Sequence, residues 1–146
     1  MRQFRTLSFQ YGLIAFLWLA TSCATSSKEY LATLEPGVLQ FYEQIKWLNG
    51  EISKNYILPA VRAAYIDQLD AASRKISLAS IEVIRITPNA KAKKAIVRVR
   101  IAWTAKDENI VHDTLVESTW ENIQGNWYHT ASKVIDGPVV PLLFGK

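Results

Sequence analysis

Apolar and polar residues follow different patterns in the two halves of this chain. In the first half, apolar residues recur three or four positions apart, which is typical of helices that bury one face. In the second half they alternate with polar residues. The clearest alternation runs from Val97 to Trp103, with two arginines and an alanine at the intervening positions. That period of two predicts a half-buried β-strand.

Three helices are predicted before the strands, after residues 30–34, which either begin a helix or form a lead-in turn. The first helix begins near Pro36 and is expected to end at a C-cap formed by Asn49 and Gly50. Its apolar stripe is Val38, Phe41, Tyr42, Ile45 and Leu48, widened by Leu39 and Trp47. A short second helix is expected over residues 51–57. A third follows Pro59, and its apolar face comprises Val61, Ala64, Tyr65 and Leu69.

Four strands are predicted, over residues 81–86, 97–103, 110–123 and 127–131, with Pro88 ending the first. Polar turns separate the last three, at residues 106–109 and 124–126, and Gly125 in the second turn is able to adopt positive φ. The segment 136–144 is predicted to be irregular and apolar. Helices followed by an antiparallel meander indicate an α+β domain with the helices packed on one face of the sheet.

The N-terminus has the layout of an export signal. Arg2 and Arg5 precede an uncharged apolar run over residues 12–19, small residues follow, and Cys23 is the only cysteine. This order of basic, apolar and small segments predicts a secretory signal peptide over residues 1–22. The apolar run is shorter than the ~20 residues that a transmembrane helix needs.

Cys23 directly after this signal resembles a bacterial lipoprotein signal. The resemblance implies that the Cys23 thiol takes a diacylglycerol, which anchors the protein to a membrane, and that cleavage makes Cys23 the first residue. The family prefers Leu where this chain has Ala20, and ordinary cleavage after Ala24 is the alternative. Residues 23–33 then form the anchor and tether, and residues 34–146 form one domain. Ala24, rather than Asp, resembles the pattern that sorts lipoproteins to the periplasmic face of an outer membrane, in a cell with two membranes.

The domain resembles the nuclear transport factor 2-like superfamily over residues 34–131. The markers are Phe41-Tyr42, Asn49-Gly50 and the segment from Trp120 to Tyr128. The resemblance implies a curved sheet wrapped around helices into a cone, with a pocket at the wide end. It departs from the family because little strand is predicted after Ala131. Relatives include isomerases, dehydratases, cyclases and non-catalytic binding modules. They often pair through the open sheet face, which makes a homodimer one expectation.

The candidate pocket residues are mostly aromatic: Trp47, Trp103, Trp120, Trp127, Tyr128 and His129. Most of the tryptophans are expected in the core, where large aromatic side chains dominate packing, and one or two are expected to line an apolar pocket. The position of His129 depends on the last hairpin. A two-residue loop at Gln124-Gly125 places His129 opposite Trp120, whereas a three-residue loop with a bulge places Tyr128 there.

No catalytic residue is predicted. His112 and Asp113 are adjacent on a strand, so their side chains point to opposite faces and cannot act as base and orienter. Two histidines without metal-ligand spacing predict no metal site, and no phosphate-binding glycine loop or activated nucleophile is found. No cofactor is expected.

Charge argues against nucleic acid as a partner. The formal charge of +4 includes Arg2 and Arg5, so removal of the signal leaves only +2. The one basic cluster, formed by Lys91, Lys93 and Lys94, lacks aromatic neighbours and is expected at a solvated hairpin tip. A weak contact of this cluster with anionic lipid headgroups is the alternative.

Arg85, Arg98 and Arg100 are expected on the outer sheet face, where Glu117 and Glu121 could pair with Arg98 and Arg100. Together these patterns predict a lipid-anchored envelope protein that binds another envelope protein or a small apolar ligand. The alternative is a small-molecule enzyme of the isomerase or dehydratase type with a polar group inside the cone. A buried, paired Asp, His or Glu would favour the enzyme, and a filled interior would favour the binding module.

Overall fold

A computed structural model describes residues 30–91 and 93–142 of the 146-residue chain. It is an α+β fold in which helices pack on a curved, antiparallel four-stranded sheet of order β1-β2-β3-β4, as predicted. The helical elements are α2 (Leu34–Lys46), α3 (Gly50–Ser53), η1 (Lys54–Tyr56), η2 (Pro59–Val61) and α4 (Arg62–Lys75). The strands are β1 (Ile76–Asn89), β2 (Lys94–Ala105), β3 (Val111–Ile123) and β4 (Asn126–Asp136).

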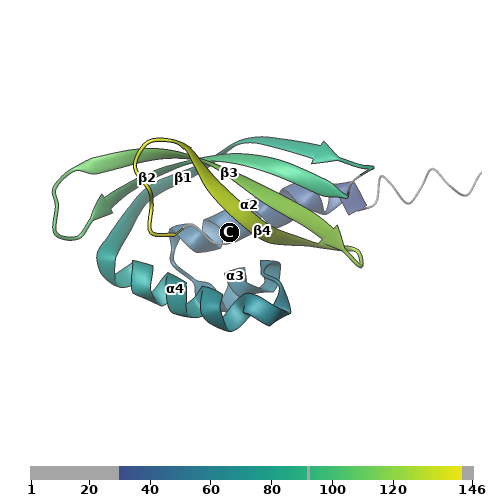
Figure 1. Cartoon of the computed structure of the whole chain (residues 1–146), viewed down its shortest axis with the longest axis horizontal. Helices are drawn as coiled ribbons and strands as arrows, with labels where there is room; N and C mark the ends of the chain where they lie inside the picture. The colour runs from purple at the N-terminus through teal and green to yellow at the C-terminus, as the bar shows by residue number, and fades with distance from the viewer. Residues whose placement is uncertain (1–29, 92, 143–146) are drawn as a thin grey trace, which may run out of the picture.

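The core lies between α2 and the concave face of the sheet. The sheet curves over α2, and α4 lies farther from the sheet (Figure 1). Every second residue of β2 from Ala95 to Trp103 is buried, as the alternating pattern predicts. The apolar stripe of α2 packs against these residues, and it consists of Leu34, Val38, Phe41, Tyr42 and Ile45.

The helix boundaries differ from the sequence prediction. α2 begins at Leu34 rather than Pro36, and its end is followed by Leu48 at a φ of 52°. Gly50 is therefore not a C-cap but the first residue of α3, where an added Cβ would lie 2.7 Å from the Cδ1 atom of Ile66. Close helix packing explains this glycine better than turn geometry does. Among the described residues, no helix combines the length and the hydrophobicity that crossing a membrane requires.

The widened apolar faces of the helices were overestimated. Leu39 is 47% exposed and Trp47 is 69% exposed, so neither contributes to the core. In α4 the buried residues are Tyr65, Leu69 and Ala72, whereas Val61 and Ala64 are exposed. Exposed and buried apolar residues of a helix look alike in the sequence, and only packing against the sheet distinguishes them.

β1 is longer than the segment 81–86 that alternation predicted, and Pro88 lies inside it, paired with Ala95. Two register shifts, between Leu78 and Ser80 and between Val83 and Arg85, interrupt its alternation. Such bulges hide a strand from a period-two pattern. Pro88 is tolerated because β1 is an edge strand, where a missing N–H does not break a ladder on both sides.

β4 extends to Asp136, so the expectation that little strand follows Ala131 is wrong. The pairing of β4 with β3 shifts register between Thr119 and Trp120 of β3, because Thr130 of β4 is an extra residue. This bulge again breaks the alternation of apolar and polar residues. The β3–β4 hairpin has a two-residue loop, with Gln124 at a φ of 53° and Gly125 at 90°. Two positive φ angles are typical of a type I′ turn, and the register places His129 opposite Trp120.

The segment after β4 folds back against the core. Gly137 adopts a φ of 84°, and a Cβ there would lie 2.2 Å from the carbonyl oxygen of Asp113. The Thr114 hydroxyl donates to the carbonyl oxygen of Pro138 at 2.7 Å. Val140 and Leu142 are then buried in the core. The described C-terminal segment therefore lies beneath the sheet (Figure 1), and its apolar residues Val140 and Leu142 join the core.

The outer face of the sheet carries a ladder of charges. The Glu117 carboxylate lies 3.3 Å from the Arg98 guanidinium and 2.8 Å from the Lys133 ammonium. Hydrogen bonds from Lys133 and then Arg98 lower the pKa of Glu117. The expected pairing of Glu121 with Arg100 is wrong, because Glu121 pairs with Lys94 at 3.0 Å and Arg100 lies 3.7 Å from Asp113. This face is solvated, so each pair contributes little to stability.

Candidate functional site

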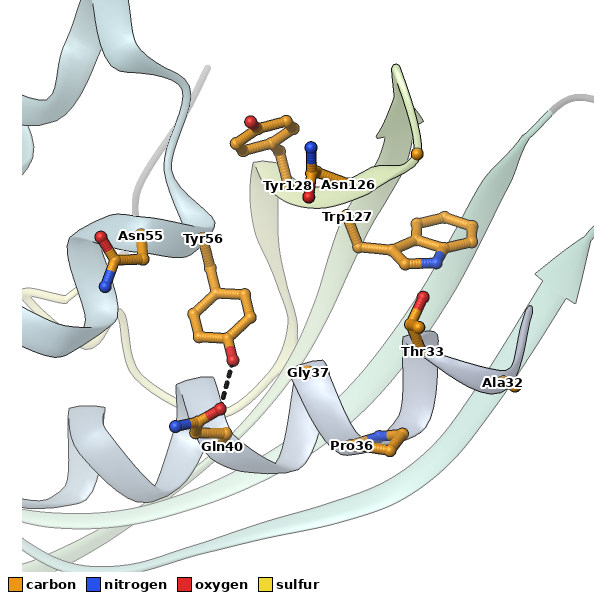
Figure 2. A pocket seen from close by; sticks show the side chains of 11 residues that line it. Ala32, Thr33, Pro36, Gly37, Gln40, Asn55, Tyr56, Asn126, Trp127 and Tyr128 are labelled. Atoms are coloured by element: carbon orange, nitrogen blue, oxygen red, sulfur yellow. Dashed lines mark hydrogen bonds between the residues drawn. The ribbon is translucent and has the colours of Figure 1, made fainter. Parts of the chain in front are cut away.

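A groove of about 490 Å³ opens between the start of α2, η1 and the β3–β4 hairpin. Figure 2 shows Tyr56 and Trp127 on its two walls, with Gly37 of α2 between them. Its lining residues are Ala32, Thr33, Pro36, Gly37, Gln40, Asn55, Tyr56, Gly125, Asn126, Trp127 and Tyr128. None of these residues carries a charge at neutral pH, so the lining combines aromatic surface with amide and hydroxyl groups.

Tyr56 is held over α2 because Gly37 has no side chain. A Cβ at Gly37 would lie 3.3 Å from the Cε1 atom of Tyr56, so a larger residue would push the ring away. The Tyr56 hydroxyl donates to the Oε1 atom of Gln40, as Figure 2 shows. Partial burial raises the pKa of Tyr56, which favours the protonated hydroxyl that donates to Gln40.

Trp127 is fixed on the opposite wall by two contacts with Tyr30. Its indole Nε1 donates to the carbonyl oxygen of Tyr30 at 2.8 Å, and the two ring centroids lie 5.9 Å apart. The indole is 5% exposed, so only a small part of it borders the groove. Both walls are therefore positioned before any ligand arrives, which reduces the entropic cost of binding.

Among the described residues, the space between α2 and the concave face of the sheet is filled rather than open. His129 lies between Phe41 and Trp120, with ring centroid distances of 5.3 Å and 5.8 Å. Its Nε2 atom lies 2.7 Å from the Ser132 hydroxyl oxygen. Burial lowers the pKa of His129 to about 4, so the imidazole is neutral at neutral pH. Neither His129 nor Ser132 lines the groove.

A second buried polar group, Ser118, was not singled out in the sequence. The hydroxyls of Ser118 and Tyr42 are 2.7 Å apart, and the Trp120 indole donates to Ser118 at 3.2 Å. Burial raises the pKa of Tyr42 to about 12, so this hydroxyl stays protonated. The one feature that could have identified Ser118 is its position on the inner face of β3, where it pairs with Val97. The buried cluster satisfies its own hydrogen bonds and leaves the aromatic core packed.

Trp103 is a core residue at the other end of the sheet. Its indole donates to the Thr114 hydroxyl at 3.0 Å, and the Thr114 hydroxyl binds Pro138 in the segment that folds back after β4. This chain of hydrogen bonds, together with buried Val140, fills the space beneath that end of the sheet. An open pocket at that end is therefore not found among the described residues.

The structure separates the predicted pocket residues into three groups. Trp127 and Tyr128 border the groove, whereas Trp103, Trp120 and His129 are buried in the interior. Trp47 belongs to neither group, and its expected place in the core is wrong. Its indole lies at the surface, where it donates to the Glu43 carboxylate at 2.9 Å. The lysine beside it, Lys46, lies 5.3 Å from its ring centroid.

His112 and Asp113 point to opposite faces of β3, as predicted. His112 packs on Trp103 with centroids 4.6 Å apart and lies 3.0 Å from the Glu108 carboxylate, while Asp113 is exposed. The structure does not bring them together as a catalytic pair. Within the described chain, no group of three His, Cys, Asp or Glu residues could hold a metal ion. Cys23 lies outside the described residues.

Comparison with protein-family models, with curated proteins and with solved structures finds no match to this chain.

Proposed function

We propose that the protein is a lipid-anchored, non-catalytic binding module of the cell envelope, and that its ligand lies in the groove between Tyr56 and Trp127. The observation that carries this proposal is the uncharged, aromatic lining of the groove beside a filled interior. The anchor rests on the lipoprotein-like signal that ends at Cys23, with the membrane as a partner through the lipid. In a cell with two membranes, the expected address is the periplasmic face of the outer membrane.

The lining points to a ligand with an apolar or aromatic body and a neutral polar edge. We expect the aromatic group of the ligand between Tyr56 and Trp127, and hydrogen bonds to the amides of Asn55 and Asn126 and to the amide nitrogen of Gln40, which all line the groove. The groove volume of about 490 Å³ falls in the range of about 300–1,000 Å³ that small-molecule sites occupy. An ionic ligand is disfavoured because no described lining residue would compensate its charge. If the partner is another envelope protein, we expect one of its apolar side chains to occupy the groove.

We also propose that the domain belongs to the nuclear transport factor 2-like superfamily. The support is the order of elements and the packing of helices on the concave face of a curved sheet. The family's enzymes place an acidic or polar group inside an open cone. In this chain the described interior holds His129, Ser53, Thr114 and Ser118 as its buried polar residues, and none is a carboxylate. His129 with its partner Ser132 is a buried, paired group of the kind that favours the enzyme. Its imidazole is packed between Phe41 and Trp120, however, and does not line the groove. This favours the binding module over the isomerase or dehydratase alternative.

Filling the groove tests the proposal. Pro36→Trp introduces a large ring at an exposed groove position on α2, and Leu39→Trp introduces the same ring at an exposed position that does not line the groove. Pro36→Trp should fail to restore the phenotype of a deletion strain at unchanged abundance, and Leu39→Trp should restore it. Purified protein should likewise lose fluorescence enhancement of a neutral apolar dye, Nile red, only with Pro36→Trp. Full complementation by Pro36→Trp would contradict the groove as the site.

The enzyme alternative is tested at the hydrogen-bonded pair of His129 and Ser132. Ser132→Ala removes the hydroxyl at 2.7 Å from the imidazole with little change in volume. The binding module predicts full complementation by this variant. Loss of complementation with unchanged unfolding free energy would instead make the polar pair the centre of the activity.

A further inference from the structure

The described chain begins between two hairpin tips at one end of the sheet. The Tyr30 hydroxyl donates to the carbonyl oxygen of Ala90, in the β1–β2 turn, at 2.7 Å. The Tyr30 carbonyl oxygen accepts the Trp127 indole N–H, beside the β3–β4 turn. The start of α2 and these tips lie together, away from the β2–β3 loop at the opposite end (Figure 1). Any tether that reaches Tyr30 therefore arrives at this end.

A basic tip lies at the same end, and we define it as Lys91, Lys93 and Lys94. Lys91 and Lys93 are exposed and form no ion pair with a described residue. Lys94 pairs with Glu121 at 3.0 Å but keeps a side chain that is 52% exposed. The tip thus carries a net positive charge. The opposite end is mixed in sign, because Lys106 is followed there by Asp107 and Glu108.

The length of the tether restricts which end of the domain can reach a membrane. Residues 24–29 separate Cys23 from Tyr30, and this stretch spans at most about 25 Å when fully extended. The 14 residues of β1 make the sheet about 45 Å long. If the β2–β3 loop faced the membrane end-on, Tyr30 would lie farther from the surface than the tether can reach. The tethered domain must therefore keep the Tyr30 end near the membrane or lie on its side.

We propose that the basic tip docks on anionic lipid headgroups of the membrane that holds the Cys23 lipid, so that the domain stands on its two hairpin tips. This inference rests on the proposed anchor. A lysine within a Debye length of an anionic leaflet shifts the population roughly fivefold toward the bound state, so Lys91 and Lys93 together contribute about 25-fold. That factor is too small to recruit a free protein. It is sufficient to orient a domain that is already tethered, because tethering supplies a high effective concentration of membrane.

Docking in this orientation places the groove next to the bilayer. The β3–β4 turn forms one of the two tips, and Gly125, Asn126 and Trp127 from this hairpin line the groove. A ligand would then enter from the layer of water just above the headgroups. Nucleic acid is a poorer occupant of the basic tip, because no exposed aromatic side chain lies among the three lysines to stack on bases.

Amine footprinting on vesicles tests the orientation with the lysines that the chain already has. Full-length acylated protein is reconstituted in phosphatidylcholine vesicles with or without phosphatidylglycerol, exposed to an acetylating reagent, and analysed by peptide mass spectrometry. Lys91 and Lys93 should react several-fold more slowly when phosphatidylglycerol is present, and high salt should abolish the difference. Lys75 and Lys106, which lie at the opposite end with Lys106 N–H donating to the Lys75 carbonyl oxygen, should react equally on both vesicles.

Charge reversal provides the matched control. Lys91→Glu/Lys93→Glu should remove the remaining lipid-dependent protection of Lys94, whereas Lys75→Glu/Lys106→Glu changes net charge equally and should leave the protection intact. Equal reactivity of both ends, protection without phosphatidylglycerol, or equally salt-sensitive binding to a single-stranded oligonucleotide would overturn the proposal. The intact mass of the protein reports acylation separately. If Cys23 is not acylated, coupling it to a maleimide lipid supplies the same tether, so failure of the anchor and failure of the docking remain distinguishable.

Discussion

The imidazole of His129 stacks on the ring of Phe41, with centroids 5.3 Å apart and planes inclined by 20°. Trp120 meets the same imidazole edge-on at 5.8 Å. His129 therefore occupies the place of an aromatic core residue, and it does so in its neutral form because burial lowers its pKa to about 4. A titratable group at the centre of an apolar cluster makes stability depend on pH.

We predict that acidification destabilises the protein through His129. The pKa is lowered from 6.5 to about 4 on folding, so the unfolded chain binds the proton more readily between these values. The stabilising effect is complete above about pH 6.5 and is lost progressively as the pH falls from there through about 4, with a total of about 3 kcal/mol. Urea unfolding at neutral and acidic pH measures the loss. His129→Phe should remove most of it and His112→Gln should not; identical pH profiles for wild type and His129→Phe would rule out this mechanism.

Phe41 should be a large contributor to stability. It is 1% exposed and contacts the rings of Tyr42, Tyr56 and Trp120 as well as His129. Phe41→Ala should lower the free energy of unfolding by about 3–5 kcal/mol, the usual cost of truncating a core aromatic. Leu39→Ala, two residues away on the exposed side of α2, should cost less than about 1 kcal/mol. Similar costs for the two variants in urea unfolding would show that the helix face is assigned incorrectly.

Substitutions at two glycines distinguish the cost of backbone strain from the cost of a steric clash. Gly125 and Gly137 both adopt positive φ, at 90° and 84°, but only Gly137 has a neighbour, since its added Cβ would lie 2.2 Å from Asp113 O. Gly125→Ala should cost about 1–2 kcal/mol from left-handed backbone alone. Gly137→Ala should cost clearly more, because it also displaces the segment that buries Val140. Thermal or urea unfolding of the pair measures the difference, and equal costs would mean that the close approach has no energetic weight.

Lipidation at Cys23 is the prediction on which the proposed address depends. Metabolic labelling with a fatty-acid analogue should mark the wild-type protein and leave Cys23→Ala unmarked, because the chain has no second cysteine. Equal labelling of both would contradict acylation at this residue. In a cell with two membranes, fractionation should place the wild type in the outer membrane, and recovery in the inner membrane would contradict the sorting inferred from Ala24.

The sequence predicted the fold where its pattern was regular. The strict alternation from Val97 to Trp103 and the stripe of Val38, Phe41 and Ile45 identify the inner faces of β2 and α2 because a repeated period is a property of the sequence itself. The ends of β1 and β4 were missed because bulges change the period inside a strand. The two-residue alternative for the last hairpin was the correct one, since Gln124 tolerates positive φ there as well as Gly125.

The candidate site was only partly predictable. Trp127 and Tyr128 were identified by their aromatic character, but Tyr56 and Gly37 were not, because nothing in the local pattern connects η1 to α2. Their proximity is a tertiary contact that needs a glycine at one position and a ring at another. Trp47 illustrates the opposite error. Its aromatic character suggested burial, yet its place after the end of α2 leaves the indole in solvent.

The two edge strands of the sheet, β1 and β4, are protected against pairing with another molecule by different means. Along β1, two bulges and Pro88 interrupt the row of free backbone groups. Along β4, the bulge at Thr130 is accompanied by a parallel bridge between Ile57 and His129, which occupies the ladder at that point. These features disfavour in-register addition of a strand from a second molecule at either edge, so we expect crowding on a surface not to convert the protein into strand-swapped polymers or fibrils.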